Sequence, residues 1–149
     1  MSGPTADGKT VHATLVAKAG NGVLLRGRSG AGKSDLAFRL MSLNDGWQLV
    51  SDDQVMLSRH GAAVAGRAPP AIAGKLELRG IGIVEVPIAL SAHVRLVVDL
   101  VPHGDVPRLP GSSDSVELLG VSLPSVKLNG LEASAPQKIA LLLSRIDKK

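Results

Sequence analysis

Residues 27–34, with the sequence GRSGAGKS, constrain the possible folds of this chain more than any other segment. Glycine adopts main-chain conformations that other residues avoid, so successive N–H groups can point inward around a phosphate. Lys33 can then reach the β- and γ-phosphate oxygens, and the Ser34 hydroxyl can bind Mg²⁺. The spacing predicts a phosphate-binding loop for ATP, formed by Gly27, Arg28, Ser29, Gly30, Ala31, Gly32, Lys33 and Ser34.

The segments on either side of this loop support the prediction. Residues 22–26 are mostly apolar and predict a strand, and residues 33–43 carry apolar side chains at the spacing of one helical face. A phosphate loop is expected between a strand and a helix. The alternative is a glycine-rich turn that contains Lys-Ser by chance, and the flanking pattern disfavours it.

Length and composition limit the number of domains and the kinds of site and partner that the chain can have. The chain has 149 residues, which predicts one ATP-binding domain over residues 11–149 after a flexible segment, residues 1–10. The chain has no cysteine, which excludes disulfides and thiolate metal sites, and its single Phe and single Trp argue against a surface that stacks single-stranded nucleic acid. The polar first residues and the lack of a long apolar run predict a cytoplasmic protein without a membrane partner.

A second strand is predicted just before the loop strand, over residues 11–17. The Asn21-Gly22 pair that follows is a strong hairpin-turn signal, so the two strands should be antiparallel neighbours. His12 would then lie at the end of the hairpin far from the turn, next to the phosphate loop. The alternative for His12 is a structural role within its strand.

Two adjacent carboxylates follow the next predicted strand, residues 47–51. A carboxylate at such a strand end can reach Mg²⁺ or a metal-bound water. Adjacent side chains on an extended chain point to opposite sides, so Asp52 and Asp53 should have different roles. Asp99, which ends the mostly apolar predicted strand over residues 93–99, is a rival. The expectation that consecutive strands lie side by side favours Asp52 and Asp53.

The remainder of the chain is predicted to be mainly strands. Residues 54–58 and 62–67 suggest a hairpin. Residues 74–86 follow, and on a strand there Glu77 and Arg79 would share one face. That face is either functional or an ordinary solvated surface. A loop over residues 101–113, one or two strands over 115–128 and a final helix from residue 135 complete the pattern.

These motifs together resemble the catalytic domain of the bacterial HPr kinase/phosphorylase family, in particular its short alphaproteobacterial form without an N-terminal domain. The matching blocks are Val11-His12 and residues 27–34, 49–53, 68–70, 76–83 and 108–109. The block LELRGIGI at 76–83 is the most diagnostic, because many ATPases share the phosphate loop.

The resemblance implies an α/β phosphate-loop kinase domain of the HPr kinase and phosphoenolpyruvate carboxykinase type, with a largely β core and few helices. It implies ATP- and Mg²⁺-dependent phosphorylation of a serine of HPr, the phosphocarrier of the phosphotransferase system, with dephosphorylation in bifunctional members. A homo-oligomer, hexameric in the family, is also implied. The alternatives are a small-molecule kinase and a nucleotide-sensing module without transferase activity.

The resemblance also assigns roles to individual residues. Asp53 would accept the proton of the serine hydroxyl, His12 would assist near the transferred phosphoryl group, and Arg108 would stabilise that group. The implied catalytic residues are His12, Lys33, Asp53 and Arg108. The implied metal ligands are Ser34 and Glu77, with Asp52 beside them.

Overall fold

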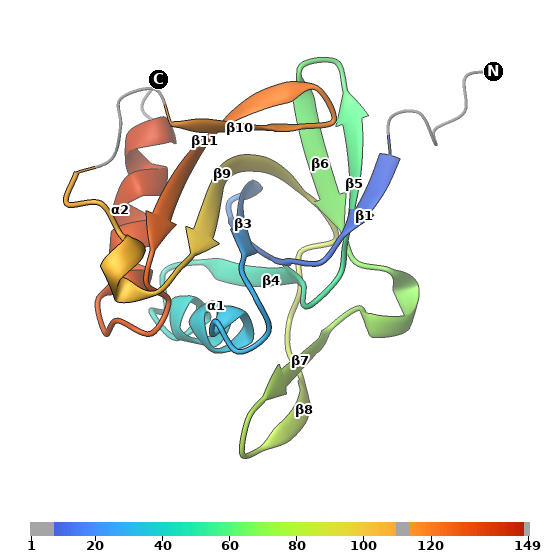
Figure 1. The fold of residues 1–149 in the computed structure, drawn as a ribbon. Coiled ribbons are helices and arrows are strands. Elements are labelled where there is room, and N and C mark those ends of the chain that lie inside the picture. Colours follow the sequence, from blue (N-terminus) through green and yellow to red (C-terminus); the bar gives the residue numbers. More distant parts are fainter. Residues whose placement is uncertain (1–7, 110–113, 148–149) are drawn as a thin grey trace.

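The computed structural model describes residues 8–109 and 114–147. Its main element is a strongly curved nine-stranded sheet, in which the main strand order is β1-β5-β6-β9-β3-β2-β4 and β10 and β11 extend the sheet from β9 (Figure 1). The strands are β1 (Gly8–Val11), β2 (Thr14–Lys18), β3 (Asn21–Arg26), β4 (Trp47–Ser51), β5 (Val55–His60), β6 (Ala63–Arg67), β9 (Ala92–Leu100), β10 (Ser115–Leu118) and β11 (Val121–Leu128).

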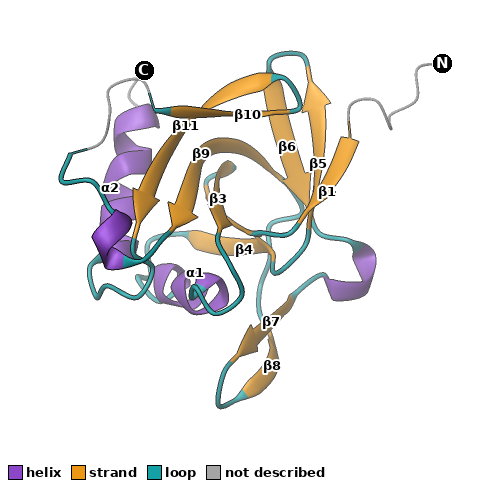
Figure 2. Cartoon of the chain, in the orientation of Figure 1, coloured by secondary structure: helices purple, strands orange, loops and turns teal. Residues whose placement is uncertain are grey.

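Two helices and one separate hairpin complete the described part of the chain. Helices α1 (Lys33–Met41) and α2 (Ala135–Asp147) lie side by side on the outer face of the sheet (Figure 2). The hairpin β7 (Lys75–Leu78) and β8 (Gly82–Glu85) projects beyond α1, and short 3₁₀ turns form at η2 (Pro70–Ile72) and η3 (His103–Asp105). The prediction of a largely β core with few helices is confirmed.

The central strands are buried on both faces. Leu25 of β3 packs with Leu36 and Ile139 of the two helices, whereas Leu24, the preceding residue, packs with Leu57 in the hollow of the curved sheet. A strand covered on both faces has no solvent-facing side chains, which explains why β3 is a continuous apolar run rather than an alternating one. This double burial fixes the end of β3, from which the predicted phosphate loop begins.

The antiparallel hairpin of β2 and β3 is confirmed, but its turn is not at Asn21-Gly22. The turn residues are Ala19 and Gly20, with φ of 53° and 81°, which is the combination that a tight hairpin turn requires. Gly22 lies within β3, where a β-carbon would come within 3.0 Å of the His93 carbonyl oxygen. Its small size therefore serves strand packing rather than the turn.

The start of the chain also differs from the prediction. The expected strand over residues 11–17 is two strands with a break at His12, because β1 pairs with β5 while β2 pairs with β3 and β4. Residues 1–7 of the predicted flexible segment lie outside the described residues, and residues 8–10 belong to β1. His12 is consequently at a strand junction rather than in a strand.

The expectation that β3 and β4 are direct neighbours was wrong. β2 lies between them, and β9 is the parallel neighbour of β3. Asp99 of β9 accepts bonds from Arg26 Nε at 2.8 Å and Nη2 at 3.1 Å, which makes it a strand residue with a structural partner. Since β3 and β4 are both antiparallel to β2, they run in the same direction, and Asp52 still follows β4 at the edge where the phosphate loop begins.

The segment over residues 74–86, in which Glu77 and Arg79 were predicted to share a strand face, is the hairpin of β7 and β8. Leu76 and Leu78 are buried and Glu77 is exposed, as the alternating pattern of β7 predicts. Arg79 lies in the turn, so it does not share a strand face with Glu77. The glycines at the turn, Gly80 and Gly82, have φ of 90° and 112°, and they explain why the chain reverses there.

Among the described residues, no helix has both the length and the apolar character needed to cross a membrane.

Candidate active site

The predicted phosphate loop joins the end of β3 to the start of α1. Gly30 and Gly32 have φ of 87° and 92°, a region that side chains disfavour. Gly27 is equally constrained, since a β-carbon there would lie 3.2 Å from both the Leu100 carbonyl oxygen and its β-carbon. The loop is thus packed closely against the end of β9.

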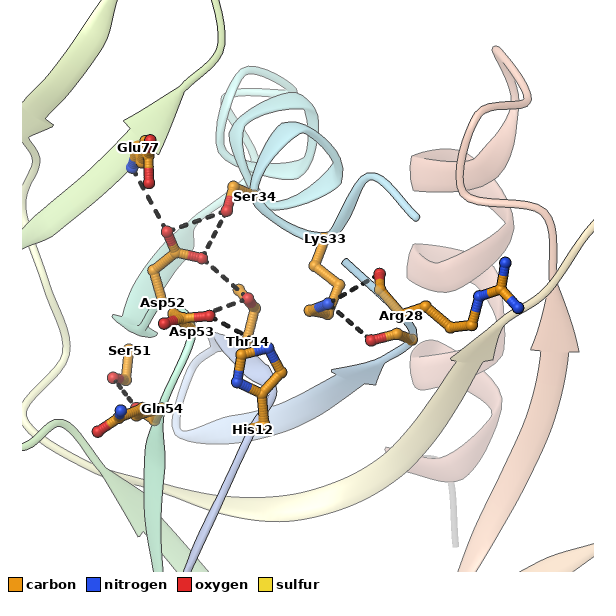
Figure 3. A network of polar contacts seen from close by, with 11 residues as sticks. His12, Thr14, Arg28, Lys33, Ser34, Ser51, Asp52, Asp53, Gln54 and Glu77 are labelled. Carbon is orange, nitrogen blue, oxygen red and sulfur yellow. Dashed lines mark hydrogen bonds and ion pairs between the residues drawn. The ribbon is translucent and has the colours of Figure 1, made fainter. Parts of the chain in front are cut away.

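Lys33 lies across this loop. It is 8% exposed, and its Nζ donates hydrogen bonds to the carbonyl oxygens of Gly27 at 2.7 Å and Arg28 at 3.2 Å (Figure 3). A phosphate held by the loop N–H groups would compete with these carbonyls for the ammonium group. The structure therefore places the Lys33 ammonium group against the loop carbonyls, and its contact with phosphate oxygens stays a prediction.

Asp52 is the central acceptor of the site. The Ser34 hydroxyl lies 2.7 Å from its Oδ1 and 2.9 Å from its Oδ2, and the Thr14 hydroxyl donates to Oδ1 at 2.9 Å. The main-chain N–H of Glu77 approaches Oδ2 at 3.4 Å, which links β7 to the same carboxylate. Asp52 is 7% exposed, so these donors replace the water that would otherwise solvate its charge.

Asp53 has a different environment from Asp52. Its φ of 75° turns the chain sharply, and its side chain, 63% exposed, lies with Oδ1 3.3 Å from His12 Nε2. The main chain at this turn is held by bonds from Asp53 N to the Thr14 hydroxyl at 3.4 Å and from Ala13 N to the Asp53 carbonyl at 3.1 Å. As expected, the adjacent carboxylates face different partners, one the phosphate loop and the other a histidine at the pocket edge (Figure 3).

A pocket of about 900 Å³ connects these groups. Its polar wall comes from the phosphate loop, the two carboxylates, His12 and the β7–β8 hairpin with Glu77 and Arg79. Of the residues that the structure describes, Arg108 is not among those lining this pocket; it is exposed in the segment after η3. The lining residues are His12, Thr14, Ser29, Gly30, Gly32, Lys33, Ser34, Asp35, Phe38, Asp52, Asp53, Glu77, Leu78, Arg79, Gly80, Ile81, Gly82 and Leu131.

Sequence reasoning missed Thr14, which is fully buried; its hydroxyl donates to the Asp52 carboxylate and accepts a bond from the main-chain N–H of Asp53. Thr14 is the first residue of β2, the strand between β3 and β4, so its hydroxyl lies at the edge where the phosphate loop and Asp52 meet. The sequence did contain a signal for Thr14: it is the only hydroxyl residue in the otherwise apolar segment 13–17, ATLVA. A polar side chain that is buried in such a strand needs a hydrogen-bonding partner.

Thr14→Val should lower the free energy of unfolding by about 1.5–3 kcal/mol, since it removes a hydrogen bond to a buried charged group without changing the side-chain shape. Thr14→Ser keeps the hydroxyl and removes one methyl group, so its loss should be about 1 kcal/mol or less. Urea unfolding of the two variants measures the difference. Equal losses would show that packing, rather than the hydroxyl, makes Thr14 important.

The model of the family described as the HPr serine kinase C-terminal domain matches residues 4–141. The chain belongs to this family. The suspected resemblance is therefore confirmed over most of the sequence.

Individual members of the HPr serine kinase family show the extent of the similarity. Proteins named HPr kinase/phosphorylase from Burkholderia lata and Burkholderia cenocepacia are each 35% identical over an alignment of 153 positions, gaps included, which covers 96% of this chain and 46% of the relative. The chain thus spans about half the length of the curated relatives it matches. The solved structure of the HPr(Ser) kinase/phosphatase from Coxiella burnetii superimposes with a TM-score of 0.78 at 27% identity, covering 92% of this chain and 89% of that one.

Proposed function

We propose that this chain is the catalytic domain of an ATP- and Mg²⁺-dependent kinase that phosphorylates a serine of HPr. The observation that carries the proposal is that two adjacent carboxylates beside a phosphate loop differ in burial and in their hydrogen-bonding partners. Asp52 is buried against Ser34, while Asp53 is exposed at the pocket edge beside His12. The names of the relatives, HPr kinase/phosphorylase, supply the reaction and the acceptor protein.

The donor set around Ser34 fits Mg²⁺. This ion prefers oxygen ligands and is commonly held by one or two carboxylates together with substrate phosphates and water. The Ser34 hydroxyl and the Asp52 carboxylate are already in contact, and the Glu77 main chain bonds to the same carboxylate. We propose that Ser34, Asp52 and Glu77 hold the ion, which would neutralise phosphate charge when bound.

The chain's own residues would carry out the transfer as follows. The loop N–H groups and Lys33 hold the phosphates, and Asp53 orients the incoming serine hydroxyl and accepts its proton. The serine oxygen forms a bond to the γ-phosphorus as the bond from that phosphorus to the β–γ bridging oxygen breaks, and ADP leaves. His12, 3.3 Å from the Asp53 carboxylate, would help to orient it.

The exposure of Asp53 favours a protein acceptor over a small molecule. A kinase for a small substrate generally encloses its acceptor, whereas a base that is 63% exposed can be reached by a serine on another protein's surface. Arg108 remains a predicted contact of the transferred phosphoryl group. Dephosphorylation and homo-oligomer formation, which the resemblance implies, remain part of the proposal, as does the cytoplasmic site of action expected from the composition.

Incubation with γ-labelled ATP and the HPr of the same organism tests the proposed function. We expect label on HPr only with Mg²⁺ present, and none on an HPr variant whose acceptor serine is replaced by alanine. ATP binding without transfer to any acceptor would favour the nucleotide-sensing alternative, and labelling of a small molecule in place of HPr would favour the small-molecule kinase.

A further inference from the structure

Leu131 is an exposed leucine that lies directly over the phosphate loop. It is 70% exposed, yet a β-carbon built on Gly32 would lie only 3.1 Å from its Cδ2. It lines the same pocket as Lys33 and Asp53. A large apolar side chain in this position leaves apolar surface open to water immediately beside the groups that would hold phosphate.

The segment that carries Leu131 is held in place by polar bonds. Arg39 of α1 donates through Nη1 to the Glu132 carbonyl at 2.9 Å and through Nη2 to the Gly130 carbonyl. The Leu131 N–H donates to Asn129 Oδ1 at 3.0 Å. The residues on either side of the exposed leucine are therefore fixed to the helix that begins at the phosphate loop.

Gly130 adds a second link to the loop itself. A β-carbon at Gly130 would lie 3.0 Å from the Ala31 carbonyl oxygen and 3.0 Å from Leu100 Cδ1. The segment before α2 thus packs against the outer side of the phosphate loop. Leu131 is a preformed part of the pocket wall rather than a side chain on an independent surface loop.

The arrangement of charges indicates which part of a nucleotide would meet Leu131. The carboxylates and His12 lie on the side of Lys33 that faces β7, and they mark the end where the γ-phosphate would react (Figure 3). Leu131 belongs to the segment that precedes α2, on the other flank of α1 (Figure 1). A bound triphosphate whose γ-phosphate lies beside the carboxylates would extend across the loop in the opposite direction. Its nucleoside would then lie toward Leu131.

We propose that Leu131 is the nucleoside contact of the site and packs its side chain against the base or ribose of a bound nucleoside triphosphate. The inference rests on the proposed function, because it requires nucleotide binding at this loop. Every nucleobase has an apolar face, so a contact of this kind stabilises binding without selecting a base by its hydrogen-bonding edge.

Calorimetry with MgATP, MgGTP and magnesium tripolyphosphate tests the proposal. Leu131→Ala should weaken ATP and GTP binding alike, by roughly five- to tenfold from the apolar area lost, and leave tripolyphosphate affinity unchanged. Leu141→Ala is the matched control, because Leu141 is an exposed leucine of α2, 52% accessible, that does not line the pocket. It should change none of the three affinities.

Three results would overturn the inference. They are an unchanged ATP affinity in Leu131→Ala, an equal loss for ATP and tripolyphosphate, and a wild-type protein that binds ATP no more tightly than tripolyphosphate. In the last case the phosphate loop would still be functional, so only the nucleoside contact would be refuted. Absence of binding by all three ligands would instead refute the proposed function, and this inference with it.

Discussion

Replacing Lys33 with alanine is expected to lower MgATP affinity by about 10²-fold or more. Lys33 is the buried cation of the phosphate loop: it is 8% exposed, and its ammonium group is held across the loop by the carbonyls of Gly27 and Arg28. Hydrogen bonds to charged groups contribute about 1.5–3 kcal/mol each, so losing the ammonium contacts with the β- and γ-phosphates should account for this decrease. Isothermal titration calorimetry measures the effect.

Lys18→Ala provides a control for the Lys33 experiment. Lys18 also carries a positive charge, but it pairs with Asp45 at 2.6 Å on the surface, and exposed ion pairs contribute little. Its replacement should leave MgATP affinity unchanged. Unchanged affinity in Lys33→Ala, with the fold intact by circular dichroism, would contradict the assignment of residues 27–34 as a phosphate loop.

Asp53→Asn is expected to lower phosphoryl transfer to HPr by about 10²-fold or more while preserving ATP binding. The amide has the size of the carboxylate but cannot accept the serine proton, and loss of a general base usually has an effect of this order. Because Asp53 is exposed and its partner is His12, the substitution should not disturb the Ser34–Asp52 contact. Initial rates with saturating ATP and HPr measure the change.

Asp52→Asn should impair a different step. Ser34 and Thr14 both donate to Asp52, so an amide there replaces one acceptor with a donor and should raise the Mg²⁺ concentration needed for half-maximal rate. At saturating Mg²⁺ its rate should fall less than that of Asp53→Asn. If the two variants exchange these effects, the roles of the two carboxylates are reversed.

Asp99→Asn is the control on the rival strand. Asp99 pairs with Arg26 and does not line the pocket, so its replacement should leave transfer intact. Loss of transfer in this variant, with normal transfer in the variants of Asp52 and Asp53, would show that the wrong strand had been chosen. It would also contradict the alignment of residues 49–53 with the family.

The phosphate loop and α1 could be predicted from sequence because their determinants are local. Glycine spacing specifies the main-chain geometry of the loop, and the apolar positions 36, 37 and 40 specify the buried face of the helix within three turns. The strands β4, β5 and β6 were also predicted from local signals, since each carries apolar residues and lies next to turn residues.

Strand order could not be predicted because it depends on contacts between distant parts of the chain. The parallel neighbour of β3 is β9, and nothing near β3 in the sequence specifies this pairing. The choice of Asp52 over Asp99 relied on β3 and β4 being adjacent, which they are not. Asp52 meets Ser34 because the intervening β2 is antiparallel to both neighbours, and the same arrangement brings Thr14 into the site.

The close packing of Gly27 against Leu100 and of Gly130 against Ala31 has a consequence for synthesis of the protein. The phosphate-loop residues are translated before the segments that support them, which are the end of β9 and the turn before α2. Domains generally fold as units, and pairings between distant segments form slowly because a long loop must close first. A nascent chain that ends before Gly130 therefore lacks part of the wall of the pocket, and the phosphate loop cannot reach its final packing until the turn before α2 has been translated.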